Sequence, residues 1–135
     1  MRGREIVGLA FFSALLFLPL GLFAADEGCE PFRGALIIGQ DADHTYLGKI
    51  ANNSDGDSIF NDFSPYGDPL SPKSIWNEFS TFGNSFNGLS PFNESSATPP
   101  EIVKDGSMIG YLSMNKNVKN SISPNALKEL CKEAL

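Results

Sequence analysis

A short phrase occurs three times in this chain at a spacing of 16 residues. The copies begin at Ser58, Ser74 and Ser90 and read "SIFNDFSPYG", "SIWNEFSTFG" and "SPFNESSATP". Counted from its serine, each copy has an aromatic residue in the third place, asparagine in the fourth and an acidic residue in the fifth. A fixed period indicates that each unit buries its apolar side against the next, and three units are about the minimum for that. The repeats are therefore 58–73, 74–89 and 90–105.

Aromatic residues recur at the third, sixth and ninth places of the units. The first two units carry Phe60, Phe63, Tyr66, Trp76, Phe79 and Phe82, and the third keeps Phe92. A spacing of three predicts short turns of 3₁₀ or α type with the aromatic side chains on one side. The first serine of each unit is a suitable N-cap, and Gly67 and Gly83 are expected to end the turns.

Two β-hairpins are predicted, one on each side of the repeats. The first lies in 34–53, where the β-type runs "ALIIG" and "TYLGKIA" flank a polar turn. The second lies in 101–115, around the tight-turn dipeptide Asp105-Gly106. The second arms are alike, with Gly48 and Gly110 at matching places, and glycine in a strand marks a bulge or a close backbone approach. We expect the hairpins to pair into one sheet.

The C-terminal sequence "SPNALKELCKEAL" predicts a short helix that is capped by Ser123 and begins with Pro124. Cys29 and Cys131 lie near the two ends of the domain, and a disulfide between them would stabilise it by about 4–5 kcal/mol in the chain-entropy model. The alternative is two free or intermolecular thiols. The expected fold is a small, irregular, mainly β domain over 25–135, in which paired hairpins, repeats with short helical turns and one helix pack together.

The chain begins with a predicted signal peptide. Arg2 and Arg4 precede an apolar run from Ile6 to Phe23, and small residues follow it. We expect residues 1–24 to be removed, although an uncleaved anchor is the alternative for a run of about 20 apolar residues. The predicted location is therefore secreted or periplasmic, with no stable membrane insertion after cleavage.

Without residues 1–24 the chain keeps 8 basic and 15 acidic residues, so its net charge is −7. An acidic surface disfavours nucleic acid and anionic lipid as partners. Cations and neutral sugars remain open as ligands.

The aromatic–asparagine pairs of the units are the main candidate ligand-binding residues. They are Phe60 and Asn61, Trp76 and Asn77, and Phe92 and Asn93. In one interpretation the rings form the core and each asparagine satisfies backbone groups in a tight turn. In the other, the rings stack on a sugar and the amides bind its hydroxyl groups.

Two polar loops, 41–43 and 53–57, are candidate calcium sites. Their possible ligands are Asp41, Asp43, Asn53, Asp55 and Asp57. The second loop has the alternating ligands that open a calcium loop, but serine replaces both the glycine and the glutamate that such a loop needs later. A solvated turn is the other interpretation.

We expect no catalytic site, because His44 beside Asp43 is accompanied by no nucleophile or zinc motif. The predicted function is an exported, non-catalytic binding or interaction module of unknown ligand, for which an envelope protein and a glycan are the candidates. A calcium-stabilised module is the alternative, and a hydrolase around His44 is the third hypothesis. No cofactor other than calcium is expected.

The repeated phrase, followed by "SATPPEIVKDGSMIGYLSMNK", resembles a family of small secreted bacterial proteins of uncharacterised function. The resemblance covers Thr45 to Leu130. The chain departs from the family pattern in the first unit, which has extra prolines, and in the third, which lacks the later aromatics. The resemblance implies a bacterial, exported protein and brings no activity to any residue.

Overall fold

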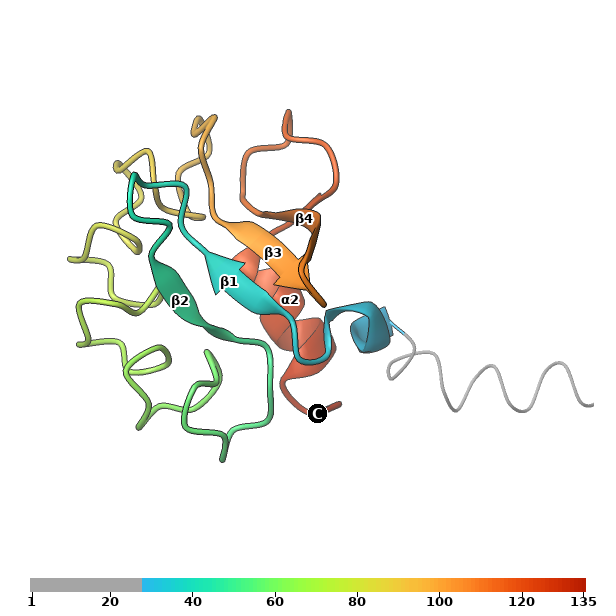
Figure 1. The fold of residues 1–135 in the computed structure, drawn as a ribbon. Coiled ribbons are helices and arrows are strands. Elements are labelled where there is room, and N and C mark those ends of the chain that lie inside the picture. The colour runs from blue at the N-terminus through green and yellow to red at the C-terminus, as the bar shows by residue number, and fades with distance from the viewer. Residues whose placement is uncertain (1–27) are drawn as a thin grey trace, which may run out of the picture.

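The computed structural model describes residues 28–135 (Figure 1), so the predicted signal peptide lies outside the described residues. A five-stranded sheet has the order β2-β1-β3-β4-β5. The elements are η1 (Glu30–Phe32), β1 (Leu36–Ile38), β2 (Tyr46–Lys49), β3 (Glu101–Lys104), β4 (Ser107–Leu112), β5 (Ser121–Ile122) and α2 (Pro124–Cys131). The predicted mainly β class is confirmed. Within 28–135, no helix is long and apolar enough to cross a membrane.

The two predicted hairpins form and pair with each other. β1 and β2 are antiparallel, β3 and β4 are antiparallel, and β1 and β3 join the hairpins in antiparallel register with Ile37 opposite Ile102. Both isoleucines are fully buried, so the seam between the hairpins is part of the core. The fifth strand, β5, pairs parallel to β4. It was not predicted, because two residues carry no alternating pattern.

Gly48 and Gly110 both allow a close approach, as their matching places predicted. A β-carbon on Gly48, whose φ is 111°, would lie 2.6 Å from the β-carbon of Tyr66. A β-carbon on Gly110 would lie 2.6 Å from the carbonyl oxygen of Asn120. The first glycine therefore brings the repeats against β2, and the second brings the segment before β5 against β4.

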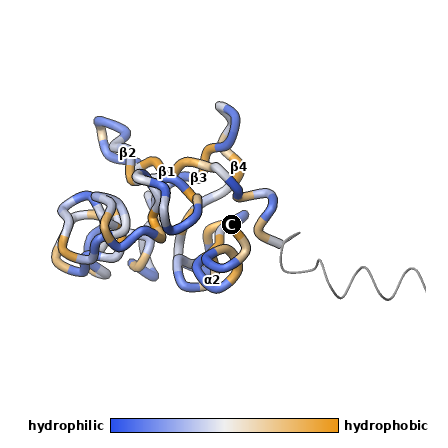
Figure 2. The backbone as a smooth tube through the Cα atoms, turned by 90° about the horizontal axis from the view of Figure 1, so that it is seen from below, coloured by the Kyte–Doolittle hydropathy of each residue, from blue (hydrophilic) through white to orange (hydrophobic). Residues whose placement is uncertain are grey.

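Helix α2 packs on one face of the sheet (Figure 2). The Ser123 hydroxyl accepts a hydrogen bond from the Ala126 backbone N–H, which confirms the predicted N-cap. Leu127 and Cys131 are fully buried in the common core. Cys131 forms a disulfide with Cys29, 102 residues away, so neither thiol is free.

Residues 51–100, which we call the coil, contain turns but neither helix nor strand. The backbone N–H of every third residue donates to the carbonyl three residues earlier, as in the series Ser58, Asn61, Ser64. In each of the first two units, one N–H donates instead to the carbonyl four residues earlier, from Asp68 to Ser64 and from Asn84 to Ser80. Each turn has the predicted i→i+3 hydrogen bond of a 3₁₀ turn, but none continues into a helix.

The polar side chain of each turn explains the serine–x–aromatic phrase. The hydroxyl oxygens of Ser58, Ser74 and Ser90 accept hydrogen bonds from the backbone N–H groups of Phe60, Trp76 and Phe92. Asn61 and Asn77 accept in the same way from Phe63 and Phe79. Such local bonds compete with helix formation. In each copy of the phrase, the serine side chain therefore binds the backbone N–H of the aromatic residue two places later.

The interior of the coil is unusually polar. The serines at the first and seventh places of all three units are buried, namely Ser58, Ser64, Ser74, Ser80, Ser90 and Ser96. The Ser64 hydroxyl donates to the Ser58 carbonyl at 2.7 Å, and Ser80 donates to Ser74 at 3.2 Å. Small side chains that bond to the backbone therefore share the interior of the coil with buried apolar residues such as Ile59, Phe60 and Ile75.

The expectation that the aromatic side chains share one side is wrong. Phe60 and Phe82, at the third and ninth places, are only 4% and 9% exposed. Phe63 and Phe79, at the sixth place, are 98% and 84% exposed. Because each step is a separate turn, the chain rotates between aromatic places and successive rings leave the coil in different directions.

Backbone hydrogen bonds attach both ends of the coil to the sheet. Lys49 in β2 pairs with Ser58 in an isolated parallel bridge. At the other end, the N–H of Leu112 in β4 donates to the Pro100 carbonyl at 2.9 Å. Seen in Figure 2, the coil is a ring-like lobe beside the sheet and α2. Its outer side is left free of the core.

Candidate functional site

Two cavities occupy equivalent positions in successive units of the coil. The first, of about 120 Å³, is lined by Ile59, Phe60, Asp62, Gly67, Pro69 and Trp76, together with one residue of α2. The second, of about 470 Å³, is lined by the residues 16 places later, which are Ile75, Trp76, Glu78, Gly83, Ser85 and Phe92. The repeat in the sequence is therefore also a repeat of cavities.

The aromatic residues at the third place form the walls between these cavities. Trp76 lines both of them, so its ring lies between the cavity of the first unit and the cavity of the second. Its indole N–H donates to the Ile59 carbonyl oxygen at 2.6 Å. Its ring meets Phe92 edge to face, with centroids 5.9 Å apart. These contacts fix the ring between the units, and a fixed ring needs little further ordering when a ligand binds.

Each place-five carboxylate lines the cavity of its own unit. Asp62 lies at the first cavity and Glu78 at the second. Glu94 lies at a third, open cavity of about 490 Å³ that also contacts Phe92 and Met114. A ring face and a carboxylate side by side are the two groups that attract an organic cation.

The first cavity is already lined by a cation from the chain itself, Lys128. The Nζ of Lys128, in α2, lies 4.9 Å from the centroid of the Trp76 ring. That distance is within the range of a cation–π interaction. No lysine or arginine of the described residues lines the second cavity. Phe79 and Phe86 border it instead, with exposed fractions of 84% and 93%.

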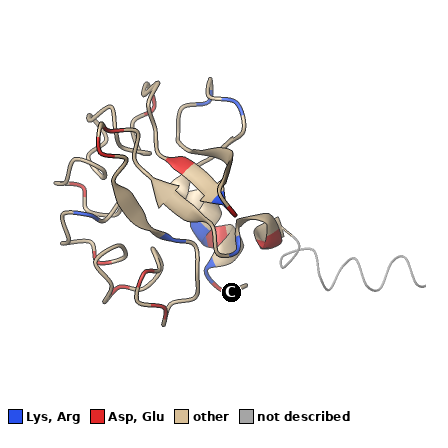
Figure 3. Ribbon diagram, viewed as in Figure 1, with Lys and Arg blue, Asp and Glu red and all other residues tan. Residues whose placement is uncertain are grey.

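The coil carries the net charge of the described protein (Figure 3). It contains one basic residue, Lys73, against six acidic residues, which gives a net charge of −5. The rest of 28–135 contains seven basic and seven acidic residues and is neutral. The acidic residues of the coil are Asp55, Asp57, Asp62, Asp68, Glu78 and Glu94. Cations are therefore attracted to this lobe in preference to the sheet.

The predicted ligand-binding pairs are divided by the structure. Phe60, Trp76 and Phe92 line the cavities described above. The side-chain amides of Asn61 and Asn77 instead donate to the backbone carbonyls of Asp55 and Ser71, at 3.0 and 2.9 Å. These two asparagines hold the coil together, as the structural interpretation of the phrase predicted.

Asn93 both stabilises its own turn and lines a cavity. Its carboxamide oxygen accepts from the Ser95 N–H at 2.9 Å, and the residue also lines the third cavity.

Four important residues were not among the predicted site residues. Glu78 and Glu94 were visible in the sequence, because every copy of the phrase has an acidic fifth place. Phe79 belongs to the aromatic sixth place, which is Phe63 in the first unit, and Phe86 had a weaker signal in the apolar thirteenth place, which is Leu70 in the first unit. The sequence did not show that these rings point outward.

The acidic loop 41–43 is held by hydrogen bonds of its own hairpin. The Asp41 carboxylate accepts from the backbone N–H of Thr45 at 2.8 Å and from its hydroxyl at 2.5 Å. The Thr45 hydroxyl, and then its backbone N–H, lower the pKa of Asp41. Asp43 and the neighbouring His44 are exposed, and His44 has a φ of 48°. The hydrolase hypothesis for His44 stays a prediction.

The carboxylates of loop 53–57 also have partners within the protein. Asp55 pairs with Lys49 at 2.8 Å, which lowers the pKa of Asp55 and raises that of Lys49. Asp57 accepts a hydrogen bond from the Tyr46 hydroxyl at 3.1 Å. The pKa of Tyr46 is raised mainly because the hydroxyl is buried, and secondly because of this hydrogen bond. Asn53 is exposed.

Across 28–135, no three or more histidine, cysteine or acidic residues are grouped closely enough to hold a metal ion. The calcium alternative stays a prediction.

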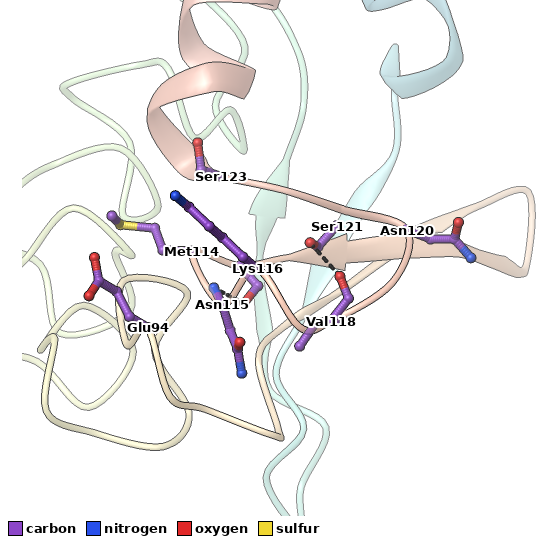
Figure 4. Close-up of a pocket in the computed structure, with 9 residues that line it drawn as sticks. Glu94, Met114, Asn115, Lys116, Val118, Asn120, Ser121 and Ser123 are labelled. Carbon is purple, nitrogen blue, oxygen red and sulfur yellow. Dashed lines mark hydrogen bonds between the residues drawn. The ribbon is translucent and has the colours of Figure 1, made fainter.

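A larger cavity, of about 570 Å³, lies between the end of the coil and the segment that leads to α2 (Figure 4). Its lining includes Glu94, Lys116 and the serines at 121 and 123. The Ser121 hydroxyl donates to the Val118 carbonyl, and the Ser123 hydroxyl caps α2. Because these hydroxyl groups serve their own segment, we place the candidate site at the aromatic cavity instead.

No protein-family model, curated protein or solved structure matches this chain.

Proposed function

We propose that this protein is an exported, non-catalytic binding module of a bacterial envelope or exterior, and that its ligand contacts the second cavity of the coil. The observation that carries the proposal is the exposure of Phe79 and Phe86 at the rim of a cavity walled by two further aromatic rings. Contiguous exposed apolar side chains mark interaction sites, and aromatic residues are enriched where partners bind.

The fixed backbone of the coil supports the proposal. The N–H groups of Phe79 and Phe86 are held by the side chains of Asn77 and Asn84, at 3.0 and 2.8 Å. A ligand therefore meets rings whose backbone is already ordered, and preorganisation increases affinity. The Cys29–Cys131 disulfide is consistent with export to an oxidising compartment.

The proposal can be tested with the fluorescence of Trp76, the chain's one tryptophan, which lies in the cavity wall. The probes are neutral oligosaccharides and short peptides of basic, acidic and apolar composition. We expect at least one probe class to shift the emission of the wild type and to lose its effect in Phe79→Ser/Phe86→Ser.

The matched control is Phe63→Ser/Leu70→Ser, which removes apolar groups from the same places one unit earlier. It should respond like the wild type. Equal loss of response in both double variants, or no response to any probe class, would contradict the proposal. Cell fractionation followed by sequencing of the mature N-terminus tests export separately.

A further inference from the structure

We infer that the second cavity binds a lysine or arginine side chain presented by a basic peptide segment of a partner protein. This inference rests on the proposed binding function and names the chemistry of the partner.

The first observation is the equivalence of the two cavities. The first is lined by Lys128, whose ammonium group lies over the Trp76 ring at 4.9 Å from its centroid. In the second cavity, Phe92 takes the place of Trp76 and Glu78 takes the place of Asp62. The chain thus uses one such site for its own cation and has a second site with the same kinds of group.

The second observation is the chemistry and size of the cavity. Trp76 and Phe92 offer ring surfaces, and Glu78 offers a carboxylate, which together favour a cation on an apolar stem. The volume of about 470 Å³ exceeds the 120 Å³ of the first cavity. This space accommodates a guanidinium group or an ammonium group together with its methylene chain.

The third observation is the separation of charge. The coil has a net charge of −5, while the remaining described residues are neutral. The negative charge of the coil guides a basic partner to this lobe and repels an anionic membrane surface. A neutral sugar could stack on the rings and donate hydrogen bonds to Glu78, but it would gain nothing from the net charge of the lobe. The exposed Phe79 and Phe86 fit apolar residues that flank the basic side chain in the partner segment.

The test uses the disulfide-bonded protein purified after export and two peptide probes, hexalysine and the same peptide with all ε-amino groups acetylated. Amide chemical shifts of the isotope-labelled protein report where each probe binds. We expect hexalysine to shift the signals of Trp76, Glu78 and Phe92 and to bind at least about tenfold more tightly than the acetylated peptide.

Two charge-matched variants separate this site from general attraction. Glu78→Gln should weaken hexalysine binding about tenfold, whereas Asp105→Asn, which removes one charge at a hairpin tip far along the chain, should change it less than about twofold. Equal effects of the two variants would overturn the inference, because they would show attraction to the acidic surface as a whole. Equal binding of the two peptides would overturn it too.

Removal of the Lys128 side chain provides an independent test of the equivalence of the two cavities. In Lys128→Ala, hexalysine should also shift the signals of Phe60 and Asp62, because the first cavity loses its internal cation. Unchanged signals there would contradict the equivalence of the cavities. If neutral oligosaccharides shift Trp76 while hexalysine does not, the basic partner is wrong and the binding module stands. If no probe acts through Phe79 and Phe86, both proposals fail.

Discussion

The indole N–H of Trp76 donates a 2.6 Å hydrogen bond to the carbonyl oxygen of Ile59, 17 residues earlier in the chain. Ile59 is 1% exposed, so its carbonyl has little access to water as a substitute partner. We expect Trp76→Phe to lower the free energy of unfolding by about 1–2 kcal/mol, because a buried acceptor loses its donor. Urea unfolding followed by circular dichroism measures the change.

Phe79→Leu is the control for that variant, since it alters an exposed ring of the same unit. Its stability should stay within about 0.5 kcal/mol of the wild type. A Trp76→Phe protein as stable as this control would show that the hydrogen bond does not join the units energetically.

The two hairpins and the helix could be predicted from local signals in the sequence, whereas the disulfide was predicted from the even number of cysteines and the expected export. Asp105-Gly106 marks the turn between β3 and β4, and Ser123-Pro124 marks the start of α2. These signals work because a tight turn or a helix cap depends on neighbouring residues only. The similar second arms of the hairpins predicted that the two hairpins pair into one sheet, but they did not predict that β1 and β3 form the seam.

The direction of the aromatic side chains could not be predicted in the same way. A spacing of three places side chains on one side only if the chain continues as a helix. Serine and asparagine hold the backbone N–H two residues ahead and stop each turn, so Phe60 turns inward and Phe63 outward. The cavities depend on contacts between units, and Lys128 reaches the first one from α2.

Gly83 is expected to tolerate no side chain. A β-carbon there would lie 2.0 Å from the carbonyl oxygen of Asn77 and 2.8 Å from that of Ile75, and neither backbone atom can move freely. We predict that Gly83→Ala lowers the free energy of unfolding by about 3 kcal/mol or more. Urea unfolding at neutral pH measures it.

Gly88→Ala is the matched control, because the nearest atom to its new β-carbon is 3.9 Å away. It should be neutral or stabilising by up to about 1 kcal/mol, since alanine restricts the unfolded chain more than glycine does. Equal stability of the two alanine variants would contradict the prediction that the coil backbone at Gly83 leaves no space for a β-carbon.

The Cys29–Cys131 disulfide closes a loop of 102 residues and ties α2 to the N-terminal end of the domain. We predict that Cys29→Ala/Cys131→Ala lowers the free energy of unfolding by about 4–5 kcal/mol, as the chain-entropy model gives for a loop of this length. The urea midpoints of the variant and of the chemically reduced wild type should agree. A loss below about 1 kcal/mol would contradict the prediction.

Acid should destabilise the protein through Asp41 and Asp55. The Thr45 donors lower the pKa of Asp41, and Lys49 lowers that of Asp55. A lowered folded-state pKa means that the stabilisation is complete above the unfolded value near 4 and disappears as the pH falls through the folded value. We therefore expect constant stability between about pH 7 and 5 and a decrease below about pH 4.

Asp41→Asn should reduce the acid-induced loss of stability, whereas Asp105→Asn should keep it, in urea midpoints measured from about pH 7 to 2.5. Each carboxylate is partly exposed to solvent, so its contribution should stay below about 1 kcal/mol. The Lys49–Asp55 pair must also weaken at high pH, because Asp55 raises the pKa of Lys49 and the contribution is lost as the pH rises through that value. An acid-induced loss that is identical in both asparagine variants would show that the Thr45 hydrogen bonds to Asp41 contribute nothing to it.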